Sequence, residues 1–125
     1  MTQARVLFFG LAVIYLAGIV VQFFLAGLGT FGATSFDAHS VFGLFLALMA
    51  LILLVVGFVG KVPRSLRALT FVLLAVNVLQ IFLAQLDVEE LAAFHVVNAL
   101  AISFIGYEVM ERSRRYLAWK LGPGD

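Results

Sequence analysis

The chain has 125 residues, of which 64% are hydrophobic and 12% are charged, with a net charge of +1 and a mean hydropathy of +1.14. A soluble domain averages about 45–50% apolar and about 25% charged residues, so this composition excludes a soluble globular protein. Cysteine is absent, which excludes disulfides and thiolate metal ligands, and the charge pattern gives no reason to expect a nucleic-acid partner.

Four long apolar stretches follow one another along the chain, at residues 6–28, 41–59, 69–86 and 91–109. A membrane-spanning helix needs about 17–25 predominantly apolar residues, so each stretch predicts one span. The first stretch is longer than the apolar core of a signal peptide, so we expect it to be a retained helix. We therefore expect one domain over residues 1–125, an all-α, antiparallel four-helix membrane bundle. Its expected helices cover about residues 5–28, 36–60, 66–86 and 89–112.

Local signals for helix ends lie between these stretches. Thr34 with Asp37, and Asp87 with Glu90, have the spacing of a cap at a helix start, where an oxygen and a carboxylate satisfy free backbone amides. Pro63 predicts the end of the second helix, because proline lacks an amide donor and restricts the residue before it. The connections are short, so consecutive helices should be antiparallel neighbours.

The basic residues all fall on one side of this topology: before the first helix, between the second and third, and after the fourth. They are Arg5, Lys61, Arg64, Arg67, Arg112, Arg114, Arg115 and Lys120. The positive-inside rule then places both termini in the cytoplasm. We expect a multi-pass protein of the inner (cytoplasmic) membrane, with the lipid bilayer as its surroundings.

A short pattern occurs twice in the chain. The segment QFFLA begins at Gln22, and QIFLA begins at Gln80. The only two histidines follow them, His39 17 residues after the first glutamine and His95 15 residues after the second. The pattern predicts two helical hairpins related as a parallel repeat. Chance matching is the alternative, because Leu, Phe and Ala are common in membrane helices.

The two histidines are the strongest candidates for a binding site. Each starts a helix on the expected extracytoplasmic side, where a single imidazole could simply bond to water or to a neighbouring helix. Two at one depth on diagonal helices favour a shared ligand, because neighbours 8–10 Å apart give a diagonal of roughly 12–14 Å. Two histidines do not complete a structural zinc site, whereas a porphyrin leaves two axial positions for them. The pattern predicts an iron porphyrin ligated by His39 and His95.

Four other residues complete the predicted haem site. Gly43 and Ala99 each lie one turn beyond a histidine, where small size suits either a flat ligand or close approach of helices. Gln22 and Gln80 are candidate partners for the haem propionates, or donors to the second ring nitrogen of a ligand histidine. Asn98 could serve similarly, three residues after His95. No catalytic residue is predicted.

A four-helix bundle with one histidine at the start of its second helix and another at the start of its fourth resembles one half of haem A synthase. The Asp37-Ala-His39 start is also similar to that of small prokaryotic four-helix membrane proteins. The resemblance covers roughly residues 5–112 and implies His39 and His95 as axial ligands. The catalytic glutamate pair of the synthase is missing here, and Ser40 replaces the positively charged residue that usually follows the histidine. The resemblance thus supports haem binding rather than oxygenase activity.

The leading interpretation is a b-type membrane cytochrome that transfers single electrons, with quinol as one candidate donor. On this interpretation the protein is an electron carrier or a haem-binding protein rather than an enzyme. The alternative is a non-haem membrane module: an assembly factor, a quinone-binding subunit or a small transporter. The sequence leaves open the electron acceptor, a redox partner protein and the formation of a homodimer.

Overall fold

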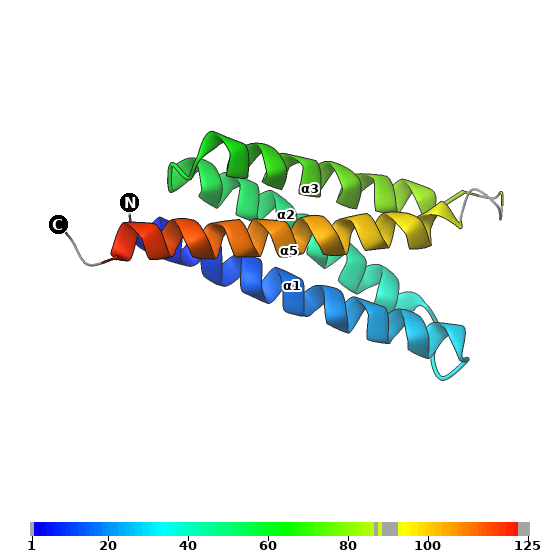
Figure 1. The fold of residues 1–125 in the computed structure, drawn as a ribbon. Helices are drawn as coiled ribbons and strands as arrows, with labels where there is room; N and C mark the ends of the chain where they lie inside the picture. Colours follow the sequence, from blue (N-terminus) through cyan, green and yellow to red (C-terminus); the bar gives the residue numbers. More distant parts are fainter. Residues whose placement is uncertain (1, 87, 89–92, 123–125) are drawn as a thin grey trace.

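The structure, a computed structural model, shows an antiparallel bundle of four described helices (Figure 1). Each helix packs against two others in the cyclic order α1, α2, α3, α5, so that α2 and α5 lie diagonally across the bundle. This arrangement confirms the all-α four-helix bundle. The helices are α1 (Thr2–Thr30), α2 (Asp37–Val59), α3 (Arg64–Leu83) and α5 (Phe94–Leu121). The residues described are 2–86, 88 and 93–122.

Three of the described helices, α1, α2 and α3, are long and apolar enough to cross a membrane, as expected for a multi-pass membrane protein. Helix α5 is not among them. The span predicted at residues 89–112 includes residues outside the described part of the chain, and His95, Asn98 and Glu108 dilute the apolar character of what remains. The fourth span therefore stays a prediction.

The buried core occupies the half of the bundle that contains the chain's N-terminus. Its largest members come from all four helices and include Phe8, Tyr15, Leu53, Leu73 and Val109. Toward the opposite end, the last buried residues of the four helices are Ile19, Leu46, Asn77 and Asn98, and none of the described helical residues beyond them is fully buried. The α1–α2 and α3–α5 hairpins diverge toward that end (Figure 1).

The outside of the bundle is apolar. Phe24, Val41, Phe71 and Phe104, one from each helix, are all more than 60% exposed. In water such a surface would be an aggregation hazard. In a bilayer it faces acyl chains, so the inside of the bundle need not be more apolar than the outside. The exposed apolar side chains thus agree with the membrane location.

Two of the predicted helix ends differ in detail. Thr34 does not cap α2: the N-cap residue is Phe36, without a side-chain cap bond, and the Thr34 hydroxyl donates to the carbonyl of Ser35. Ser35 instead bonds to the Asp37 carboxylate at 2.7 Å, because serine and aspartate readily form local bonds of this kind. The second predicted cap, at Asp87 and Glu90, lies outside the described residues.

Pro63 acts at the start of α3 rather than at the end of α2. Helix α2 already ends at Val59, and Lys61 takes up a left-handed conformation with φ 48°. Pro63 is the residue immediately before α3, where its fixed φ suits entry into a helix.

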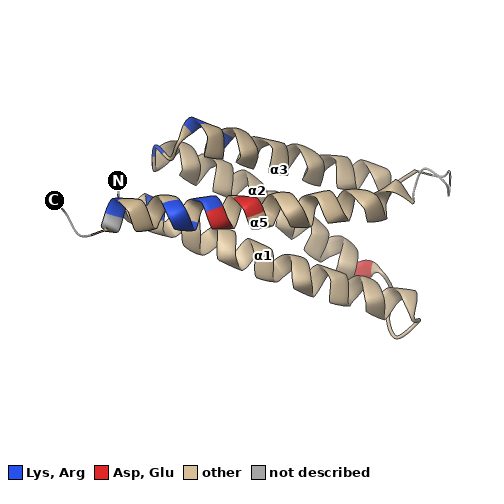
Figure 2. Ribbon diagram, in the orientation of Figure 1, with Lys and Arg blue, Asp and Glu red and all other residues tan. Residues whose placement is uncertain are grey.

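Helix α5 continues to Leu121, beyond the predicted end at residue 112. The extension is polar, and ion pairs one turn apart lie where it begins, between Arg112 and Glu108 and between Arg115 and Glu111. Pairs with this spacing stabilise exposed helix modestly, so the helix outlasts its apolar stretch. Figure 2 shows the lysines and arginines gathered at this end of the bundle.

Candidate functional site

The two histidines meet at the end of the bundle where the hairpins diverge. His39 lies in the first turn of α2 and His95 in the first turn of α5. Their ring centroids are 6.1 Å apart, with 62° between the ring planes, and both side chains are half-buried. The fold therefore brings together two residues that are far apart in the sequence, at one depth and across the diagonal, as predicted.

Each histidine is held by a glutamine from the preceding helix of its own hairpin, through two hydrogen bonds. The Gln22 amide donates to the carbonyl oxygen of His39 at 2.9 Å, and Nδ1 of His39 lies 3.3 Å from the carbonyl oxygen of Gln22. Gln80 and His95 form the same two contacts, at 3.0 Å and 3.2 Å. The repeated Gln and His of the sequence thus form two equivalent reciprocal pairs.

These contacts fix the tautomer of both rings. A carbonyl oxygen can only accept a hydrogen bond, so Nδ1 of His39 and Nδ1 of His95 each carry a proton. In the neutral imidazole the other nitrogen, Nε2, is then unprotonated. A ring held through Nδ1–H to a backbone carbonyl, with a free Nε2, is the arrangement common to metal-ligating histidines.

The glutamines contact the imidazole rings through a different atom from the one expected. The side chains of Gln22 and Gln80 are the expected partners of the ring nitrogens, whereas the backbone carbonyls of these residues make the contact. The side-chain amides bind the backbone of the histidines instead. A helical carbonyl has a second lone pair and can accept from a neighbouring helix without losing its own helical bond. Contact of either glutamine with a haem propionate stays a prediction.

The two pairs are not identical in their surroundings. Asn98 donates to Gln80 Oε1 at 2.7 Å and to the carbonyl of Val76 at 2.8 Å. The corresponding residue, three positions after His39, is Phe42, and Gln22 Oε1 is buried without a hydrogen-bond partner among the described residues. Asn98 thus supports the second pair through Gln80 rather than through the imidazole itself, and the first pair lacks this support.

Gly43 has an explanation that does not involve a cofactor. A Cβ atom at this position would lie 2.9 Å from Nε2 of Gln22, so the missing side chain makes room for the amide that holds His39. At Ala99, the backbone carbonyl accepts a bond from the Ser103 hydroxyl at 2.8 Å. Whether Gly43 or Ala99 also lies against a bound ligand stays a prediction.

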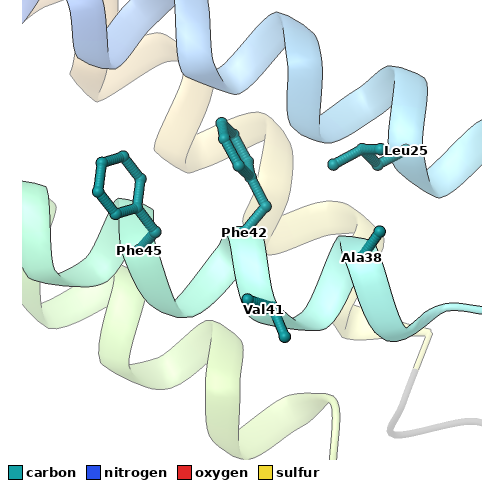
Figure 3. A pocket seen from close by; sticks show the side chains of 5 residues that line it. All are labelled: Leu25, Ala38, Val41, Phe42 and Phe45. Atoms are coloured by element: carbon teal, nitrogen blue, oxygen red, sulfur yellow. The ribbon is translucent and has the colours of Figure 1, made fainter.

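An open apolar groove runs along α1 and α2 beside the first histidine (Figure 3). It measures about 510 Å³ and contains no polar side chain. This lining suits hydrocarbon and offers neither a proton carrier nor a ligand. Its lining residues are Leu25, Ala38, Val41, Phe42 and Phe45.

Protein ligands alone do not complete a metal site here. Within the described part of the chain, no group of three or more His, Cys, Asp or Glu residues is placed to hold a metal ion. His39 and His95 can therefore act as a metal centre only where a second ligand supplies the remaining positions, and an iron porphyrin supplies four.

A protein family described only as a family of unknown function, DUF6220, matches residues 22–87, which is more than half of the 125 residues. No curated protein and no solved structure matches the chain significantly. The resemblance to haem A synthase therefore stays a prediction that depends on the histidine pattern. The matched segment includes both glutamines and His39, but it ends before His95.

Proposed function

We propose that this chain, which belongs to the family of unknown function DUF6220, is a b-type membrane cytochrome that holds one haem b between His39 and His95. The observation that carries the proposal is the histidine pair itself. The ring centroids are 6.1 Å apart. In each ring the hydrogen bond to the glutamine carbonyl is made by Nδ1, which leaves Nε2 available to a metal.

The separation of the rings is one at which His39 and His95 could both ligate a single metal ion. Metal–imidazole bonds of about 2.0–2.1 Å on either side of an ion put two ring centres roughly 6 Å apart. None of the described helical residues beyond Ile19, Leu46, Asn77 and Asn98 is fully buried, which is also compatible with a bound group at this end. The residues present therefore fit haem.

The residues of the chain would orient this group and exclude water from it. The reciprocal bonds from Gln22 and Gln80 fix the rotation of each imidazole, which lowers the entropy lost when the metal binds and raises the basicity of Nε2. A bound haem supplies one-electron redox chemistry. The proposed activity is electron transfer near the extracytoplasmic face, from quinol or from a redox partner protein. The proposal includes a fourth span formed by α5 and cytoplasmic termini.

The test is the visible spectrum of the purified protein. We expect a Soret band that sharpens and shifts on reduction with dithionite, with the low-spin form of a six-coordinate iron. His39→Ala and His95→Ala should each give a high-spin spectrum or lose the haem. Gln85→Ala, an exposed polar residue at the same end, is the matched control and should keep the wild-type spectrum.

Two results would overturn the proposal. If both histidine variants keep the wild-type reduced spectrum, the ligands are wrong. If the wild-type protein is colourless after purification and after addition of haemin, the non-haem membrane module becomes the better interpretation, and the histidine pair would then join the two hairpins without a metal.

A further inference from the structure

A second groove lies between α2 and α3, at the end of the bundle where the basic residues gather (Figure 2). It measures about 450 Å³. Unlike the apolar groove beside His39, it combines two arginines with apolar side chains. The residues that line it are Leu54, Phe58, Arg64, Arg67, Ala68, Phe71 and Val72.

The arginines of this groove have no acidic partner in the described part of the chain. The ion pairs among the described residues all lie within α5, where they join Glu108 and Glu111 to arginines of the same helix. Arg67 instead lies over the ring of Phe58, at 4.9 Å from its centroid, and its Nε is buried without a hydrogen-bond acceptor. The guanidinium charge of Arg67 therefore has no anionic protein partner among the described residues.

The position of the arginines in α3 adds to the excess positive charge. Arg64 is the first residue of the helix, and Arg67 follows one turn later. The first turn contains no acidic residue, and the N-cap residue, Pro63, makes no side-chain bond to it. The N-terminus of a helix carries partial positive charge, so basic residues there are unfavourable unless an anion is close. An anion at this point would compensate the helix end and both guanidinium groups together.

We propose that this groove binds one anionic phospholipid, with its phosphate on Arg64 and Arg67 and an acyl chain against Phe58, Phe71 and Val72. Planar guanidinium groups match the geometry of phosphate oxygens. The apolar part of the lining gives the acyl chain a place that a free phosphate would not need. Basic pockets between membrane helices on the cytoplasmic side are suited to such headgroups. The assignment is independent of haem binding at the other end of the bundle.

The experiment is native mass spectrometry of the full-length protein in detergent with added dioleoyl phosphatidylglycerol or dioleoyl phosphatidylcholine. We expect one phosphatidylglycerol to be retained in preference to phosphatidylcholine. Arg64→Gln and Arg67→Gln should each lower this retention about five-fold, the factor expected for one basic residue near an anionic headgroup. Arg115→Gln is the matched control, because it removes the same charge from the same end but lies outside the groove.

Several outcomes would overturn the assignment. Equal retention of the two lipids, or an equal loss in Arg115→Gln, would show that the arginines do not form a specific site. Displacement of the lipid by excess inorganic phosphate, or equal retention of a short-chain phosphatidylglycerol, would show a phosphate site without a role for the apolar lining. Arg67 is half-buried, whereas Arg64 is exposed, so Arg64→Gln provides the test should Arg67→Gln fail to fold.

Discussion

Tyr15 and Asn77 form a polar contact in the middle of the buried core. Tyr15 is 1% exposed and Asn77 is 5% exposed. The Asn77 amide donates to the Tyr15 hydroxyl at 2.7 Å and to the carbonyl of Leu73. The contact joins α1 and α3, which lie diagonally across the bundle. The tyrosine ring also packs closely against α5 at Gly106, where an added Cβ would lie 3.2 Å from the ring.

We expect this contact to stabilise the bundle by about 0.6 kcal/mol, the average measured for hydrogen bonds between membrane helices, and by at most about 1.7 kcal/mol, the largest value measured. A double-mutant cycle of Tyr15→Phe and Asn77→Ala, measured by reversible unfolding in mixed micelles, should give a coupling energy in this range. Tyr107→Phe, at a half-exposed tyrosine of α5, combined with Asn77→Ala is the control and should show no coupling. A Tyr15–Asn77 coupling within error of zero would contradict the prediction.

Gly43 makes a second prediction at the level of single residues. Gly43→Ala should displace the Gln22 side chain, because the new Cβ would lie 2.9 Å from its amide nitrogen, and the bond to the His39 carbonyl should be lost. We expect the free energy of unfolding to fall by about 1 kcal/mol. In the Gln22→Ala background the same change should be neutral or stabilising, since alanine favours helix over glycine.

The comparison for Gly43→Ala is Gly27→Ala, in α1, where nothing lies within 4 Å of an added Cβ. That variant should gain about 0.5–1 kcal/mol through helix propensity alone. If Gly43→Ala behaves like Gly27→Ala, the glycine does not serve to accommodate Gln22. Thermal unfolding followed by circular dichroism is sufficient to rank these variants.

At the level of elements, α1 and α2 end in the same turn with different residues. After α1, Gly32 has φ 71°, and Ala33 bonds back to the carbonyl of Leu28. After α2, Lys61 has φ 48°, and Val62 bonds back to the carbonyl of Gly57. Both are Schellman motifs, whose left-handed position favours glycine because a side chain there is strained.

Substitutions at Lys61 and Gly32 should have opposite effects on the free energy of unfolding. Lys61→Gly should raise the free energy of unfolding by about 1 kcal/mol, and Gly32→Ala should lower it by a similar amount. No neighbour lies within 4 Å of an added Cβ at Gly32, so its effect would come from the backbone alone. Reversible unfolding of both variants checks the pair. Destabilisation by Lys61→Gly would mean that the lysine side chain matters more than its backbone conformation.

At the level of the whole molecule, charge is distributed unevenly between the two ends. Figure 2 shows the basic residues gathered at one end of the bundle. Asp37, the first residue of α2, lies at the other end. Since membrane proteins keep basic segments in the cytoplasm, this asymmetry predicts that the turn at Pro63 is cytoplasmic and that the turn at Gly32 is extracytoplasmic.

The natural absence of cysteine makes the orientation simple to measure. A cysteine introduced at Gly32 or Val88 should react in intact cells with a thiol reagent that does not cross the membrane. A cysteine at Pro63 should react only after the cells are opened. The unsubstituted chain is the control for background labelling. Labelling of Pro63 in intact cells would reverse the topology and move the histidine pair to the cytoplasmic side.

Sequence alone determined the helical bundle, the membrane location and the pairing of the two halves. Long apolar stretches form helices in a membrane because every backbone polar group must be bonded internally, and this requirement is readable from composition. The repeated Gln and His, at Gln22 and His39 and again at Gln80 and His95, indicate two equivalent hairpins without any knowledge of contacts. Charge placement likewise separated the two ends, because it depends on chain order and helix direction only.

Only the tertiary structure decided what these residues contact. It put the ring centroids of His39 and His95 6.1 Å apart, gave the ring contact to the glutamine carbonyls rather than to their side chains, and explained Gly43 by the space that Gln22 occupies. Such facts depend on the rotation and crossing of helices that are distant in the sequence. Rotation and crossing are set by side-chain packing over the whole interface, and no local pattern of residues encodes them.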